Sequence, residues 1–159
     1  MKQTITRKYI SLHIPDLSHV TPQHNERHYL YIGESSVIRV ELKNDIYELE
    51  KKTDISKTVR EEEVIPLAKE EFEQLAKYAS FHIVRDSYIV SDNPKIILRI
   101  YKDRFEGLNR CEVFFNTDED ALRFQPPDWF GAEITNSPLG KDMTLLKLSD
   151  EEFNELVGH

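Results

Sequence analysis

The chain has 159 residues, 39% of them hydrophobic and 31% charged, which suits one polar domain with its own core. Its formal net charge of −8 argues against a nucleic-acid-binding surface, and no apolar run approaches the roughly 18 residues of a membrane span. Cys111 is the only cysteine, which excludes an internal disulfide and a cysteine-based metal site. We therefore expect a cytoplasmic protein that binds neither nucleic acid nor membrane.

The N-terminal half is rich in short segments of strand-forming residues with alternating character. The predicted strands cover residues 4–13, 29–32, 36–42, 46–52 and 58–65. Residues 14–28 have no clear period, so we predict a polar connection there with solvated histidines. The turn Lys43-Asn44-Asp45 joins the third strand to the fourth as a hairpin.

The clearest helical pattern begins at Pro66, a residue that suits the first turn of a helix, and continues to about Ala79. Its apolar positions include Phe72 and Leu75. Strands are predicted over 81–90, 95–102 and 111–115, and a short helix over 118–124. Ser149 followed by Glu152 is a capping box, which predicts a C-terminal helix over 150–157.

These elements predict one domain over residues 1–159 with about eight strands and a few flanking helices. Hairpins dominate the pattern, so the fold class is α+β with an antiparallel sheet. Closure of that sheet into a β-barrel would remove its exposed edges. We therefore expect a closed antiparallel barrel.

Parts of the C-terminal half resemble a known domain. The strongest matches are Gly107-Leu108, Glu112 and the stretch from Trp129 to Thr135. They resemble the end of the CYTH domain, the fold of triphosphate tunnel metalloenzymes, and the likeness extends in consistent order along nearly the whole chain. The resemblance implies a tunnel lined by alternating acidic and basic side chains, in which triphosphates are hydrolysed or cyclised.

The resemblance also implies which cations would bind phosphate, since residues two apart on a strand share one face. The residues on that face are Lys8, Arg39, Lys52, Arg60, Arg85 and Arg99. Guanidinium forks and ammonium groups both suit phosphate oxygens. Alternatively, these cations pair with acids across strands and seal the tunnel; the acids are Glu41, Glu50, Glu62 and Glu112.

Hydrolysis in the family depends on Mg²⁺ or Mn²⁺ held by several carboxylates, which position the attacking water. Of those acidic positions, Glu62 and Glu112 remain and are the candidate metal ligands. Phe114 replaces another acid, and Arg99 stands where an acidic ligand is expected and would repel a dication. This departure predicts a weakened metal site, or none.

Three functions remain open, and the sequence identifies no catalytic residue. The first is a tunnel protein that binds a triphosphate, nucleotide or polyphosphate with lost or weakened hydrolase activity. The second is an active metal-dependent triphosphatase, for inorganic triphosphate, thiamine triphosphate or a nucleotide, or an adenylyl cyclase. The third is a non-catalytic scaffold with a closed tunnel, whose acidic surface contacts an unidentified protein.

Overall fold

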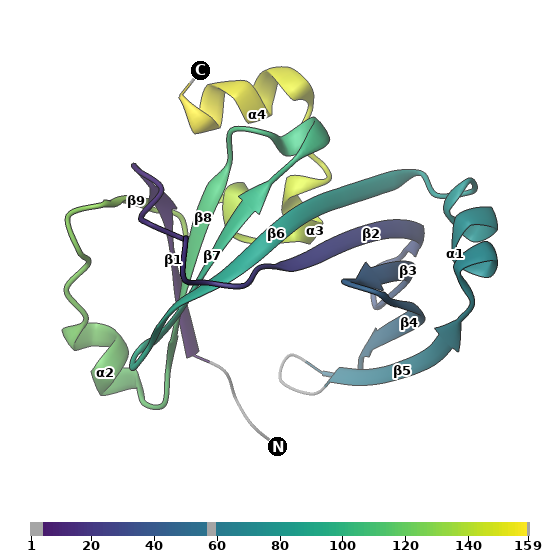
Figure 1. Ribbon diagram of the computed structural model, residues 1–159, viewed down its shortest axis with the longest axis horizontal. Coiled ribbons are helices and arrows are strands. Elements are labelled where there is room, and N and C mark those ends of the chain that lie inside the picture. The colour runs from purple at the N-terminus through teal and green to yellow at the C-terminus, as the bar shows by residue number, and fades with distance from the viewer. Residues whose placement is uncertain (1–4, 57–59, 159) are drawn as a thin grey trace. The chain divides into compact units, whose positions relative to one another are not determined.

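The computed structural model describes residues 5–56 and 60–158, which form two compact units (Figure 1). The first unit contains residues 23–84, and the second contains residues 5–22 and 85–158. The strands form an antiparallel sheet in the order β5-β4-β3-β2-β6-β7-β8-β1-β9. Because this order begins at β5 and ends at β9, the sheet is open among the described residues, and the predicted closed barrel is not confirmed.

The first unit is built from four hairpin-connected strands, one helix and the start of a long strand. These elements are β2 (Gln23–Ile32), β3 (Ser36–Lys43), β4 (Ile46–Asp54), β5 (Arg60–Leu67), α1 (Lys69–Ala76) and the first residues of β6 (Phe81–Asp92). The helix packs against β2, β3 and β4. The Phe72 ring there meets the rings of His28 and Tyr47.

Two predictions for the first unit are wrong. Residues 23–28 belong to β2 rather than to an irregular connection. Sequence periodicity missed this strand because one of its buried positions is the polar Asn25, so apolar residues do not alternate there. Pro66 does not begin the helix but lies in β5, an edge strand in which a residue without an N–H group is tolerated.

The second unit combines five strands with short helices at the C-terminal end. Its elements are β1 (Ile5–Ser11), the rest of β6, β7 (Lys95–Tyr101), η1 (Asp103–Phe105), β8 (Asn109–Phe115), α2 (Asp118–Arg123), β9 (Phe130–Glu133), η2 (Pro138–Gly140), α3 (Asp142–Leu145) and α4 (Asp150–Val157). The capping box predicted at Ser149 is present. Neither β9 nor α3 was predicted, because four residues are too few to show a period.

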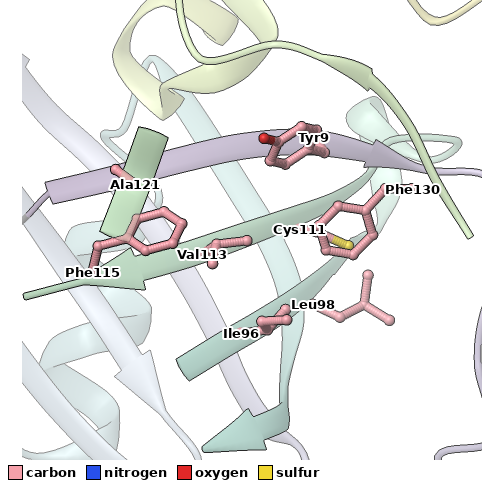
Figure 2. Packing of buried hydrophobic residues seen from close by; sticks show 8 residues of the cluster. All are labelled: Tyr9, Ile96, Leu98, Cys111, Val113, Phe115, Ala121 and Phe130. Carbon is pink, nitrogen blue, oxygen red and sulfur yellow. The ribbon is translucent and has the colours of Figure 1, made fainter. Parts of the chain in front are cut away.

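One face of β1, β7 and β8 carries the core of the second unit (Figure 2). The cluster consists of Tyr9, Ile96, Leu98, Cys111, Val113, Phe115, Ala121 and Phe130. Burying a leucine such as Leu98 contributes roughly 1.5–3 kcal/mol to folding. Cys111 is fully buried in this cluster, and the residues before and after it on β8 therefore point to the opposite face. Among the described residues, no helix has the length and apolar character needed to cross a membrane.

Candidate functional site

Basic side chains gather on the face of β8 opposite the apolar core. Arg110 and Glu112 share this face because they are two residues apart on the strand. The register sets Lys8 of β1 opposite Glu112, and Arg99 of β7 opposite Arg110. Three neighbouring strands therefore bring three cations and one acid together in the second unit.

Glu112 lies between these cations and is 6% exposed. Its carboxylate accepts hydrogen bonds from Arg99 Nε at 2.7 Å and from Arg110 Nη2 at 3.0 Å. Lys8 Nζ lies 4.0 Å from the same carboxylate. Burial would raise the pKa of Glu112, but Arg110 and Arg99 outweigh that effect and lower it, so the side chain is held as a carboxylate.

A second acid, Asp142, stands at the first residue of α3 and meets three donors. Its carboxylate accepts hydrogen bonds from Tyr101 Oη at 2.6 Å, Arg85 Nη1 at 2.7 Å and Arg110 Nη2 at 3.2 Å. Burial raises the pKa of Tyr101 to about 12, so this hydroxyl keeps its proton and acts as a donor. Arg110 therefore links the two acids, because Nη2 also donates to Glu112.

Two backbone carbonyl oxygens just before α3 accept further hydrogen bonds from the same cations. Lys8 Nζ donates to the Gly140 oxygen at 2.6 Å, and Arg110 Nη1 donates to the Leu139 oxygen at 3.0 Å. Only glycine fits at position 140, because an added Cβ would lie 2.3 Å from the backbone oxygen of Ile134. The close approach of this segment depends on that glycine.

The cation cluster, defined as Lys8, Arg85, Arg99 and Arg110, carries more charge than its acidic partners neutralise. Four basic groups face two carboxylates, Glu112 and Asp142, which leaves a formal excess of two positive charges. Arg85 and Arg110 are 4% and 2% exposed, and neither Nε has a hydrogen-bond partner among the described residues. Burial lowers the pKa of Lys8 and of Arg99. Buried positive charge in excess favours the binding of an anion.

The first unit holds a separate ionic network between β2, β3 and β4. Arg39 Nη2 donates to Glu50 at 2.8 Å, and Arg27 Nε donates to Glu41 at 2.8 Å. Lys43 Nζ lies 3.2 Å from Glu50. Glu41 and Glu50 are 0% and 1% exposed. Burial would raise the pKa of Glu50, but a hydrogen bond with Glu41 and the charges of Arg39 and Lys43 lower it to about 2. The acids and cations of this network nearly balance.

The other predicted residues of the first unit lie on β4 and β5. Lys52 is half-buried and stands opposite Glu62 in the register, and burial, together with the charge of Arg39, lowers the pKa of Lys52. Glu62 is exposed. Arg60 begins β5, but its side chain lies outside the described residues, so its predicted role stays a prediction.

The predicted phosphate-binding cations therefore divide between the units. Lys8, Arg85 and Arg99 lie in the cation cluster of the second unit, whereas Arg39 and Lys52 lie in the first unit. The cross-strand ion pairs of the alternative prediction are present between Arg39 and Glu50 and between Arg99 and Glu112.

Sequence reasoning missed several members of these networks. Arg110 stands two residues before Glu112 on one strand, so strand alternation alone would have found it. Arg27 was missed because its strand was taken for an irregular connection. Asp142 and Tyr101 meet only through folding, since 41 residues separate them, and no local pattern signals such a contact.

The side chains around the candidate metal ligands do not suit a divalent cation. Glu112 already has three cationic neighbours that would repel Mg²⁺ or Mn²⁺. Within residues 5–56 and 60–158, no group of three or more His, Cys, Asp or Glu side chains could hold a metal ion. The carboxylates Glu41 and Glu50 are likewise engaged by cations.

A hollow of about 510 Å³ lies beside α2 in the second unit, apart from the cation cluster. Phe114, Phe115 and Phe124 supply aromatic parts of its lining. Its charged lining residues are Asp92, Lys95, Asp120 and Arg123, whose charges cancel. The hollow therefore gives no indication of a ligand's charge.

Comparison with known proteins identifies the fold. No protein-family model and no curated protein matches the chain. A solved structure of the inorganic triphosphatase NE1496 is 23% identical with a TM-score of 0.79, and the match covers 94% of this chain and 97% of that one. The chain has the fold of this triphosphatase. The predicted CYTH-type, triphosphate-tunnel fold is thereby confirmed.

Two further solved structures resemble the chain. One, called the hypothetical protein NE1496, is 23% identical with a TM-score of 0.77 and covers 91% of this chain and 97% of its own. The other is a conserved hypothetical protein from Pyrococcus furiosus, 11% identical with a TM-score of 0.50 and 94% coverage of each chain. At these identities the likeness establishes the fold alone.

Proposed function

We propose that the chain is a triphosphate-tunnel-type protein that binds a (tri)phosphate-type anion through the cation cluster and has weak or no hydrolase activity. The excess of positive charge on the buried Arg85 and Arg110 and the half-buried Lys8 and Arg99 is the observation that supports this function. Guanidinium groups bind phosphate oxygens in pairs, and the lysine adds a point charge. The fold is shared with a protein called an inorganic triphosphatase, which agrees with this ligand class.

We propose further that binding needs no metal ion. Arg99 stands where the sequence resemblance implies an acidic metal ligand, and Ser87 Oγ and Glu112 accept hydrogen bonds from its guanidinium at 2.8 and 2.7 Å. These contacts orient a fixed positive charge within the cluster. Such a charge would offset phosphate oxygens that otherwise require a dication.

Weak hydrolysis follows from the state of the acids in the cluster. A general base works best when its pKa is near the working pH, because it must be both deprotonated and basic. The neighbouring arginines lower the pKa of Glu112, so its carboxylate is a poor base for activating water. Asp142 already accepts hydrogen bonds from two arginines and a tyrosine, so its oxygens are not free to orient an attacking water.

The other two functions stay open as alternatives. A metal-dependent triphosphatase or adenylyl cyclase would have to assemble its metal ligands from acids that are now paired with cations. A scaffold with a sealed interior is favoured by the first unit, where three cations face three carboxylates: Arg27, Arg39 and Lys43 with Glu41, Glu48 and Glu50. The cytoplasmic location expected from the sequence stays a prediction.

Thermal melting in EDTA with sodium tripolyphosphate tests the proposed ligand. A ligand that binds only the folded chain adds about 2.7 kcal/mol of stability at a hundred times its Kd, so the midpoint should rise by several degrees. In Arg99→Gln the rise should fall to less than half. Arg123→Gln removes the same charge from a side chain that is 79% exposed, and it should keep the full rise. An unchanged response in Arg99→Gln would exclude the cluster as the site, and no response in the natural chain would favour the scaffold.

A further inference from the structure

Asp142 occupies the position at which the cation cluster would hold an anion. Its two carboxylate oxygens accept hydrogen bonds from Arg85, Arg110 and Tyr101, all within 3.2 Å. Carboxylates and phosphates accept the same charge-assisted hydrogen bonds from arginine. The side chain therefore has the contacts expected of a bound phosphate group.

The segment that carries Asp142 is anchored independently of this carboxylate. Leu139, Leu145 and Leu146 are 1%, 0% and 2% exposed, so apolar burial fixes the residues on both sides. Arg110 and Lys8 bind the backbone oxygens of Leu139 and Gly140. Asp142 is the only charged residue of α3, and its side chain can rotate away while the backbone stays in place.

We propose that Asp142 is an internal competing anion that sets the affinity and the charge selectivity of the cation cluster. An entering anion has to displace the carboxylate or bind beside it, and either costs free energy. A ligand with several phosphate groups offsets this cost with additional contacts to Lys8 and Arg99, whereas a single phosphate does not. Selectivity thus arises from a repulsive group as well as from attractive ones. This inference rests on the proposed anion-binding function.

Isothermal titration of the full chain in EDTA tests this role with three probes: orthophosphate, pyrophosphate and tripolyphosphate. Asp142→Asn keeps the size of the side chain but removes one negative charge next to the ligand. It should tighten tripolyphosphate binding about tenfold and bring orthophosphate binding into the measurable range. Glu119→Gln removes one negative charge from a side chain that is 79% exposed and should leave all three affinities unchanged. Asp142→Glu keeps the charge and should not tighten binding.

The outcomes separate the two proposals. If the natural chain binds tripolyphosphate and Asp142→Asn binds no more tightly, Asp142 does not compete and this inference is wrong. If neither chain binds any probe, the anion-binding function itself fails. Should Asp142→Asn not fold, the natural chain is labelled with ¹³C-aspartate, and saturating tripolyphosphate should shift the Asp142 carboxylate resonance. A resonance that does not move would overturn the inference.

Discussion

Consecutive residues of β8 have opposite environments, and this alternation defines both the core and the candidate site. Cys111 is fully buried among apolar side chains, whereas Glu112 faces Arg99, Arg110 and Lys8. The sequence predicted that Glu112 lies with Lys8 and Arg99, since strand alternation and the CYTH resemblance agree at these positions. It did not predict Asp142 as a member of the site, because that contact depends on the path of residues 134–142.

Burial determines the chemistry of Cys111. It raises the pKa of this thiol to about 12, so almost none of it is thiolate at pH 8. We expect less than a tenth of the thiol to react with iodoacetamide in an hour in the native chain, and complete reaction after unfolding in guanidinium chloride. Mass spectrometry of the two samples measures the difference. Rapid alkylation of the native chain would show that the core around β8 opens readily.

At the scale of elements, the start of β2 was misjudged from the sequence because one of its buried positions, Asn25, is polar. β2 carries His24, Glu26 and His28 at alternate positions, which therefore share one face. His28 stacks on His82 at 5.7 Å between ring centroids and meets Phe72 of α1 edge-on. The histidines predicted to be solvated in a loop thus include one, His28, that packs between a strand and a helix.

His28 should make the stability of the chain depend on pH. Burial lowers the pKa of His28, and the nearby His82 lowers it further, although the charge of Glu26 acts in the opposite direction. Because the folded pKa lies below the unfolded value of about 6.5, the unfolded chain binds protons first as pH falls. The contribution of His28 to the free energy of unfolding is therefore complete above about pH 6.5, and it is lost as the pH falls below that value. Urea unfolding should show stability falling between pH 7.5 and 5.5.

The matched variants for this effect are His28→Asn and His19→Asn. His28→Asn should flatten the decline in unfolding free energy over that pH range, since its side chain does not titrate. His19 is exposed outside the helices and strands, so His19→Asn should retain the slope of the natural chain. Equal slopes for all three chains would mean that His28 is protonated as easily in the folded state as in the unfolded one.

At the scale of the whole molecule, eight of the nine strands of the described residues, the prevalence of hairpins and the fold type were predictable from the sequence. Whether the sheet closes into a barrel was not predictable, because alternation determines which side chains share a face but not whether the two edge strands meet. Net charge was also a poor guide to the site. A chain with a net charge of −8 gathers four basic side chains, two buried and two half-buried, around two acids in one unit. The ligand class thus depends on where charges lie rather than on their sum.

We propose that the cation cluster binds a polyphosphate anion without a metal ion. Calorimetric titration with tripolyphosphate in EDTA, and again with Mg²⁺ or Mn²⁺, measures it most directly when phosphate release is followed in the same samples. We predict binding in EDTA with an affinity at least equal to that measured with metal, and no phosphate release above the rate without protein. Binding that requires the metal ion, accompanied by metal-dependent phosphate release, would rule out metal-free binding and indicate an active triphosphatase.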